Sequence, residues 1–84
     1  MRHFIVIQKN YSIMGIGNTK EEALQEVCEW TNYNNTNDIQ YKESYNTANE
    51  GDFCLLQCTK DLYDYVCKGG QFYEVNNNIA TKEQ

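Results

Sequence analysis

The stretch from Gly15 to Thr31 reads GIGNTKEEALQEVCEWT and holds the strongest local folding signals of the chain. Thr19 and Glu22 form a capping box, in which each side chain can bond a backbone N–H that the first helical turn leaves unpaired. Residues suited to a buried stripe then recur at i, i+3, i+4 and i+7: Leu24, Val27, Cys28 and Thr31, widened by Ala23 and Trp30. We therefore expect an amphipathic helix over about residues 19–31, packed by this stripe on a sheet.

Two glycines, Gly15 and Gly17, come directly before this helix. In a strand, such glycines mark a bulge, a bend or the close approach of another backbone. A helix that follows glycines can also bind phosphate. The run from Gly17 to Lys20, however, has neither the third glycine of a dinucleotide-binding motif nor the Gly-Lys-Ser/Thr of a Walker loop. The sequence therefore favours a geometric role for both glycines.

The segments around this helix predict strands and one further helix. Phe4–Ile7 is continuously apolar, as in a central strand, and a turn at residues 8–10 connects it to a second strand. Further expected elements are a second strand at Tyr11–Ile16, a buried strand at Phe53–Cys58, a short helix over about residues 60–68 capped by Thr59, a strand at Gln71–Val75 and a frayed tail at 79–84.

Residues 32–52 are rich in Asn, Thr, Tyr and charge. Ile39, Tyr41 and Tyr45 alternate with polar residues, which predicts a half-exposed strand around Asp38–Tyr45. Its tyrosines either cover a core or contact a partner. The expected fold is α+β: one domain, 1–84, with a mostly antiparallel sheet and both helices on one face.

The charge balance points to a basic partner. The 84 residues carry 12 acidic against 7 basic side chains, a net charge of -5, which repels nucleic-acid phosphates and anionic membranes. Arg2, His3 and Lys9 make only a small basic patch for direct nucleic-acid binding. The apolar run at Phe4–Ile7 is too short for a signal peptide or a membrane span, so we expect a cytoplasmic protein.

Metal and catalytic motifs are missing from the sequence. Cys54 and Cys58 lie four residues apart, about 13 Å along a strand, whereas two zinc-bound sulfurs lie about 4 Å apart. We therefore expect free, mostly buried thiols at these positions and at Cys28 and Cys67, with no metal or cofactor. His3 is the sole histidine, and Asp61 and Asp64 have no evident catalytic partner. The chain is expected not to be an enzyme.

The outer face of the predicted helix at residues 19–31 is acidic. Glu22, Glu26 and Glu29 stand at i, i+4 and i+7, with no basic residue four positions away. Such a row is either a solvated face or a surface that docks on a basic protein. The candidate partner-binding residues are therefore Glu22, Glu26, Glu29, Tyr41 and Tyr45.

The run Gly15-Ile16-Gly17-Asn18-Thr19-Lys20-Glu21-Glu22-Ala23-Leu24 resembles the strand-to-helix junction of HicB-type antitoxins and related partial RNase-H-like domains. The resemblance covers residues 4–31 and implies binding to a small basic ribonuclease toxin. The chain departs from that family in the approach to the junction and in the helix and strand that follow.

In type, the short, acidic, proline-free chain is also similar to the anti-defence proteins of bacteriophages, including anti-CRISPR proteins. This second resemblance implies an inhibitor that occupies the nucleic-acid-binding surface of a host defence protein, which is our leading hypothesis. The alternatives are a HicB-like antitoxin, and a small nucleic-acid binder or enzyme.

Overall fold

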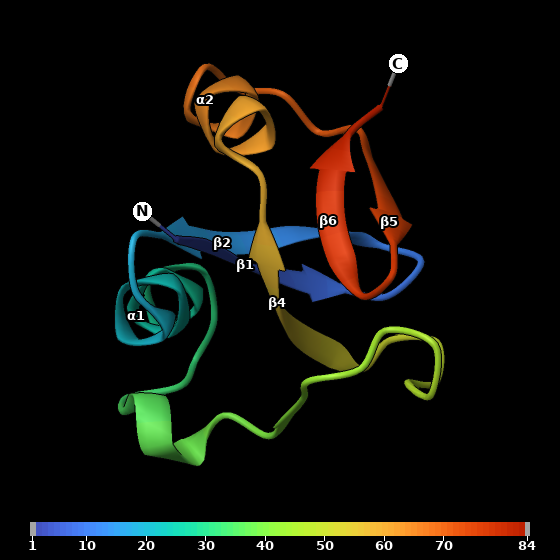
Figure 1. Ribbon diagram of the computed structural model, residues 1–84. Coiled ribbons are helices and arrows are strands. Elements are labelled where there is room, and N and C mark those ends of the chain that lie inside the picture. Colours follow the sequence, from blue (N-terminus) through green and yellow to red (C-terminus); the bar gives the residue numbers. More distant parts are fainter. Residues whose placement is uncertain (1, 84) are drawn as a thin grey trace.

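The amino-terminal strands form the centre of a sheet. The computed structural model describes residues 2–83, and in it β1 (His3–Gln8) pairs antiparallel with β2 (Ser12–Gly17). The hairpin turns at Asn10, whose φ of 67° is the left-handed conformation that asparagine tolerates. On its other side β1 pairs antiparallel with β4 (Phe53–Cys58), so the prediction of a central strand at residues 4–7 is confirmed (Figure 1).

The sheet has the strand order β2-β1-β4-β6-β5, and β3 adds to β4 beside this path. Three pairs of strands are antiparallel, and β3–β4 and β4–β6 are parallel. The α+β class with a mostly antiparallel sheet is therefore confirmed. The remaining elements are α1 (Lys20–Trp30), η1 (Thr36–Asp38), β3 (Tyr41–Lys42), α2 (Lys60–Cys67), β5 (Tyr73–Asn76) and β6 (Ile79–Lys82).

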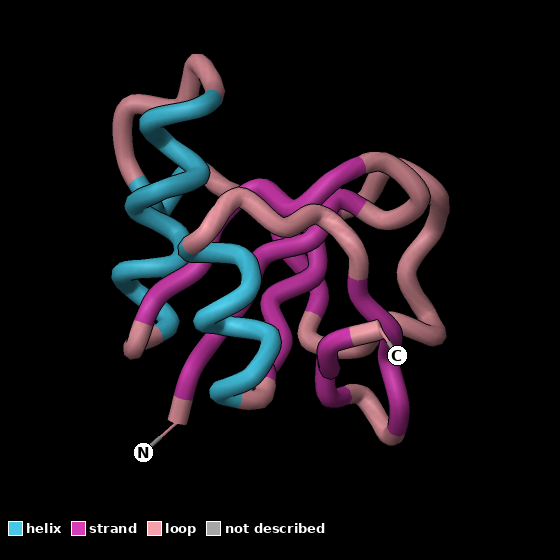
Figure 2. Tube along the Cα trace, turned by 90° about the horizontal axis from the view of Figure 1, so that it is seen from above, coloured by secondary structure: helices cyan, strands magenta, loops and turns pink. Residues whose placement is uncertain are grey.

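The two helices lie on opposite faces of the sheet, so the prediction that they share one face is wrong. Val6 and Leu55 pack with the buried residues of α1, whereas Ile5 and Leu56 pack with Leu62 of α2. The reason is that β1 and β4 are apolar at successive residues, which point to opposite faces. Figure 1 shows α2 above and α1 below β1 and β2, and Figure 2 shows both helices over the same half of the molecule.

Residues 79–82 are a strand, and the predicted frayed tail is wrong for this segment. β6 pairs with both β4 and β5, and Ala80 is completely buried in the core beneath α2. Asn77 and Asn78 have φ of 52° and 65°, so they form a hairpin turn rather than the end of ordered structure. Gln84 lies outside the described residues.

The predicted strand at Asp38–Tyr45 is too long: the structure has a strand only at Tyr41–Lys42, which pairs with Phe53 and Cys54. Side-chain contacts fix the following loop instead. Lys9 Nζ donates to the carbonyl oxygens of Tyr45 (2.8 Å) and Ala48 (2.9 Å). These contacts satisfy the backbone at this point, which explains how the segment is ordered without a longer strand.

Candidate functional site

Helix α1 begins where the sequence predicts. The N–H of Glu22 donates to Thr19 Oγ1 at 3.0 Å, and Glu22 Oε1 accepts from the N–H of Asn18 at 2.9 Å. The Thr19 half of the capping box is therefore formed, whereas Glu22 bonds the N–H of the residue before the cap instead of that of Thr19. These two bonds fix the entry into the helix, so Glu22 holds a structural position as well as a place on the outer face.

Gly15 and Gly17 allow the helix to lie directly on β2. A Cβ at Gly15 would lie 2.3 Å from the carbonyl oxygen of Ala23, and one at Gly17 would lie 2.5 Å from Cβ of Glu22. The prediction of a geometric role for the two glycines is confirmed, and of the alternatives left open the structure shows the close approach of another backbone. This contact turns the buried residues Ala23, Leu24 and Val27 toward the sheet and leaves the glutamates outside.

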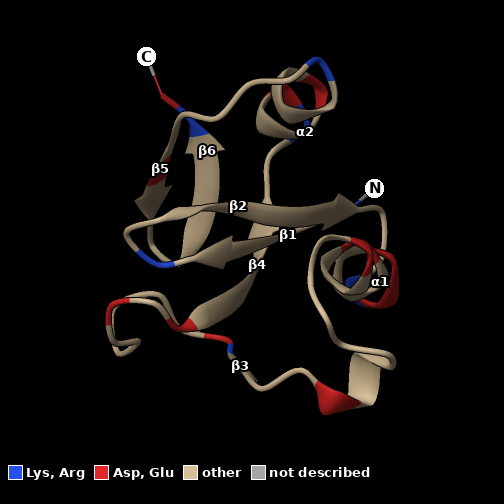
Figure 3. Ribbon diagram, turned by 180° about the vertical axis from the view of Figure 1, so that it is seen from behind, with Lys and Arg blue, Asp and Glu red and all other residues tan. Residues whose placement is uncertain are grey.

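Figure 3 shows acidic residues on the side of α1 that faces away from the sheet, and Glu22, Glu26 and Glu29 recur in this helix at i, i+4 and i+7. Glu22 and Glu29 are exposed and Glu26 is half-buried. Desolvation raises the pKa of Glu26, the charge of Glu29 raises it further, and a backbone hydrogen bond from Ile16 opposes both effects. The repulsion between these carboxylates is therefore only partly compensated by the protein itself.

No cation of residues 2–83 forms an ion pair with these glutamates. The ion pairs in that range join Lys20 to Glu43, Lys42 to Asp52 and Lys60 to Asp64. A positively charged group of another molecule could therefore approach these glutamates without displacing a lysine or arginine of residues 2–83.

Trp30 is the site residue that the sequence analysis missed. It was assigned to the buried stripe, but its side chain is 74% exposed, so that assignment is wrong. The helix contacts the sheet through Ala23, Leu24 and Val27, with Cys28 packed against them, and Trp30 is not part of this cluster. Trp30 follows Glu26 at i+4, so it continues the row of Glu22 and Glu26. We call Glu22, Glu26, Glu29 and Trp30 the α1 surface.

The two predicted tyrosines do not join the α1 surface. Tyr41 lies on β3 and is 38% exposed, next to Lys42 and Phe53. Tyr45 packs against the core, where its hydroxyl lies 3.4 Å from that of Tyr73 and its ring lies under Lys9 Nζ at 4.7 Å. Burial and this hydrogen bond raise the pKa of Tyr73. Tyr45 is therefore held within the protein rather than presented to a partner.

The histidine and two of the four cysteines, which are the residues most suited to chemistry, are buried in the protein. His3 is buried, stacks on Tyr63 with ring centroids 4.4 Å apart, and lies with Nδ1 2.9 Å from Asn18 Oδ1. All four cysteines are free; Cys54 and Cys58 are buried. Burial, with a smaller effect of Cys67, raises the pKa of Cys58 to about 12, so this thiol stays protonated at neutral pH.

Within the part of the chain described, no three His, Cys, Asp or Glu side chains come together as metal ligands. No helix of residues 2–83 has the length and apolarity needed to cross a membrane. Comparison with family models, curated proteins and solved structures gives no match in any of the three. A function for this chain can therefore be inferred only from the side chains of the α1 surface and their surroundings.

Proposed function

We propose that this chain is a non-enzymatic protein-binding module that docks the α1 surface on a basic surface of a partner protein. The observation that carries the proposal is a row of glutamates that has no ion pair among residues 2–83, continued by a tryptophan that is 74% exposed. Complementary charge speeds association and orients the partner, and a buried tryptophan supplies affinity. The two features lie on one helix and so can act on the same partner.

The partner is proposed to be a nucleic-acid-binding protein of a bacterial defence system, with this chain as a phage or mobile-element inhibitor of the anti-CRISPR type. A nucleic-acid-binding surface has the dense Lys and Arg that complement the α1 surface. Occupying it would exclude the nucleic acid. In this proposal Tyr41 is an additional contact at the periphery.

The alternative partner is a small basic ribonuclease, as the resemblance of residues 15–24 to HicB-type antitoxins implies. The same α1 surface would serve it, since the toxin is also basic. Growth of cells that express such a toxin, with and without this chain, distinguishes the alternative from the leading proposal.

The test is affinity capture from a bacterial lysate at low salt with matched variants. One variant combines Glu26→Gln, Glu29→Gln and Trp30→Ala, and the control combines Asp38→Asn and Glu50→Gln, which remove the same charge from exposed positions outside α1. We expect a basic protein that the wild type and the control retain, the α1 variant loses, and rising salt releases.

Competition by labelled DNA or RNA for the captured protein then tests the finer proposal. Equal capture by the α1 variant and the control would contradict docking through α1. A captured protein that binds no nucleic acid would contradict the defence-protein partner while leaving the use of the α1 surface in place.

A further inference from the structure

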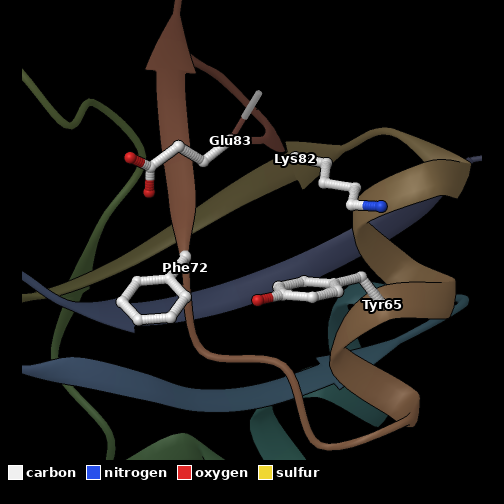
Figure 4. A pocket seen from close by; sticks show the side chains of 4 residues that line it. All are labelled: Tyr65, Phe72, Lys82 and Glu83. Carbon is white, nitrogen blue, oxygen red and sulfur yellow. The ribbon is translucent and has the colours of Figure 1, made fainter.

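A second exposed aromatic group lies on the far side of the molecule, in a cleft between α2 and the β5–β6 hairpin. The cleft is lined by Tyr65, Phe72, Lys82 and Glu83 (Figure 4). Phe72 is 66% exposed although it directly precedes a strand. Its ring therefore lies outside the core, at the rim of the cleft.

One wall of the cleft is the ring of Tyr65. The ring of Tyr65 lies against Gly70, where an added Cβ would come within 2.3 Å of it. The N–H of Gly70 donates to the carbonyl oxygen of Tyr65 at 2.9 Å, which closes the end of α2. Lys82 Nζ lies 5.2 Å from the centre of the same ring. Tyr65 is thus already engaged by the chain, and the free aromatic surface is that of Phe72.

Phe72 and Glu83 lie just beyond the end of the β5–β6 ladder. The last pair of the ladder is Tyr73 with Lys82, and Phe72 and Glu83 are the residues next outward from it. In Figure 4 the carboxylate of Glu83 lies on the same side as the ring of Phe72. Glu83 has no ion pair within residues 2–83. An aromatic ring beside a free carboxylate favours a cationic side chain.

β5 is an open edge of the sheet. It ends the strand order β2-β1-β4-β6-β5, so its outer side has no ladder partner among the described residues. β5 can therefore accept an added strand on this outer side.

The ring of Phe72 and the carboxylates of Glu83 and Glu74 lie within reach of a strand added to β5. A residue of an added strand placed opposite Phe72 would lie about 10 Å from Glu83, twice the spacing between strands. The stem of an arginine or lysine can cross the Phe72 ring over that distance and bring its charge to Glu83. Two residues along, the added strand would face Glu74, an exposed carboxylate on the same side of β5 as Phe72.

We propose that the outer edge of β5, next to this cleft, binds an extended cationic segment of a partner protein, which pairs with β5 and presents two basic side chains at alternate positions, one on Phe72 and Glu83 and one on Glu74. The net charge of -5 favours such a segment over a second copy of the chain. This site is separate from the α1 surface and does not depend on it.

The test uses the full chain, labelled with ¹⁵N, and two acetylated and amidated peptides of identical composition. TRVKVT places its basic residues on one side of a strand, and TVRKVT places them on opposite sides. We expect TRVKVT at millimolar concentration to shift the amide signals of residues 72–76 and 82–83. TVRKVT should bind about fivefold more weakly, since only one of its basic side chains can reach the acceptors.

The matched variants are Phe72→Ala and Glu83→Gln, both at exposed positions. Each should weaken the binding of TRVKVT by about fivefold. The α1 variant with Glu26→Gln, Glu29→Gln and Trp30→Ala should bind it unchanged, which separates this inference from the proposed function.

Three results would overturn the inference: no shifts with TRVKVT, equal binding of both peptides, or shifts confined to α1. Sedimentation of the wild type should show a monomer. A dimer that Phe72→Ala dissociates would assign the cleft to a second copy of the chain and would also overturn it.

Discussion

The α1 surface and the cleft beside α2 are built in different ways. The α1 surface lies on one helix, and its side chains follow from helical spacing alone. The cleft joins α2, the loop before β5 and the end of β6, which meet only because the carboxyl-terminal hairpin folds back beside α2. Substitution of an exposed side chain such as Glu29 on α1 therefore alters the charge of the surface and leaves the fold in place. A substitution in the hairpin, by contrast, alters the shape of the cleft itself.

The two regions also differ in charge. The α1 surface has three carboxylates and no intramolecular ion pair among residues 2–83. The cleft contains both signs, and Lys82 already faces Tyr65. Binding at α1 should thus depend on long-range attraction and weaken strongly with salt, while binding in the cleft depends more on shape and short contacts.

The largest effect is expected from Ala80→Asp in β6. Ala80 is completely buried in the core beneath α2, and a carboxylate there would be desolvated, so we expect the free energy of unfolding to fall by at least about 4 kcal/mol. Urea denaturation followed by circular dichroism measures it. Ile79→Asp, at a neighbouring residue that is 38% exposed, is the control and should cost about 1 kcal/mol. Equal small losses would mean that β6 frays.

A smaller effect is expected from adding a methyl group at a glycine in each region. In Gly15→Ala the new Cβ meets the backbone oxygen of Ala23, which cannot move without moving α1, and the expected loss is about 3 kcal/mol. In Gly70→Ala it meets the ring of Tyr65, which can rotate away, and the expected loss is about 1 kcal/mol. Urea denaturation of both variants tests the difference, and the reverse order would show that the cleft wall is the more rigid contact.

The sequence predicts α1 well because each signal there is local. The capping box of Thr19 and Glu22, the buried Leu24 and Val27 and the outward glutamates all follow from spacing within one helix. Trp30 was misassigned because it lies at the edge of the apolar stripe, where spacing alone does not decide whether a side chain is covered. The acidic face could be predicted, and its aromatic end could not.

The cleft could not be predicted from the sequence. In the sequence, Asn77 and Asn78 suggest the end of ordered structure. In the structure they have positive φ angles and form a hairpin turn, because Ala80 is buried next to β4. The face of the sheet on which each helix packs also depends on contacts between residues far apart in the sequence, so it could not be predicted either. β1 and β4 are apolar on both faces, so their composition is compatible with helices on either.

Trp30→Ala and Val27→Ala separate the outer and inner faces of α1. Val27 is completely buried, and its truncation should cost about 2 kcal/mol. Trp30 is mostly exposed, so its truncation should change the free energy of unfolding by less than about 0.5 kcal/mol. Thermal denaturation of both variants measures this. A loss of about 3 kcal/mol or more for Trp30→Ala would place the indole in the core and remove it from the α1 surface.

The smallest effect is the pH dependence of Glu26→Gln, which reports the charge repulsion on α1. The pKa of Glu26 is raised above its ordinary value of 4.5, first by desolvation and then by Glu29, so the folded state holds this proton more tightly than the unfolded state. The stability that depends on this proton is complete below pH 4.5 and is lost as the pH rises through the folded-state pKa. At pH 7 the glutamine variant should therefore have a slightly higher Tm than the wild type, and the difference should vanish in acid.

Glutamine suits this test because its side-chain oxygen can still accept the hydrogen bond from Ile16. Glu50→Gln, on an exposed loop, removes the same charge and controls for the lower net charge of the variant. If both variants gain the same Tm at pH 7, the neighbouring glutamate contributes nothing particular to α1. A gain specific to Glu26→Gln would show that the helix carries unrelieved repulsion, which a basic partner could relieve on binding.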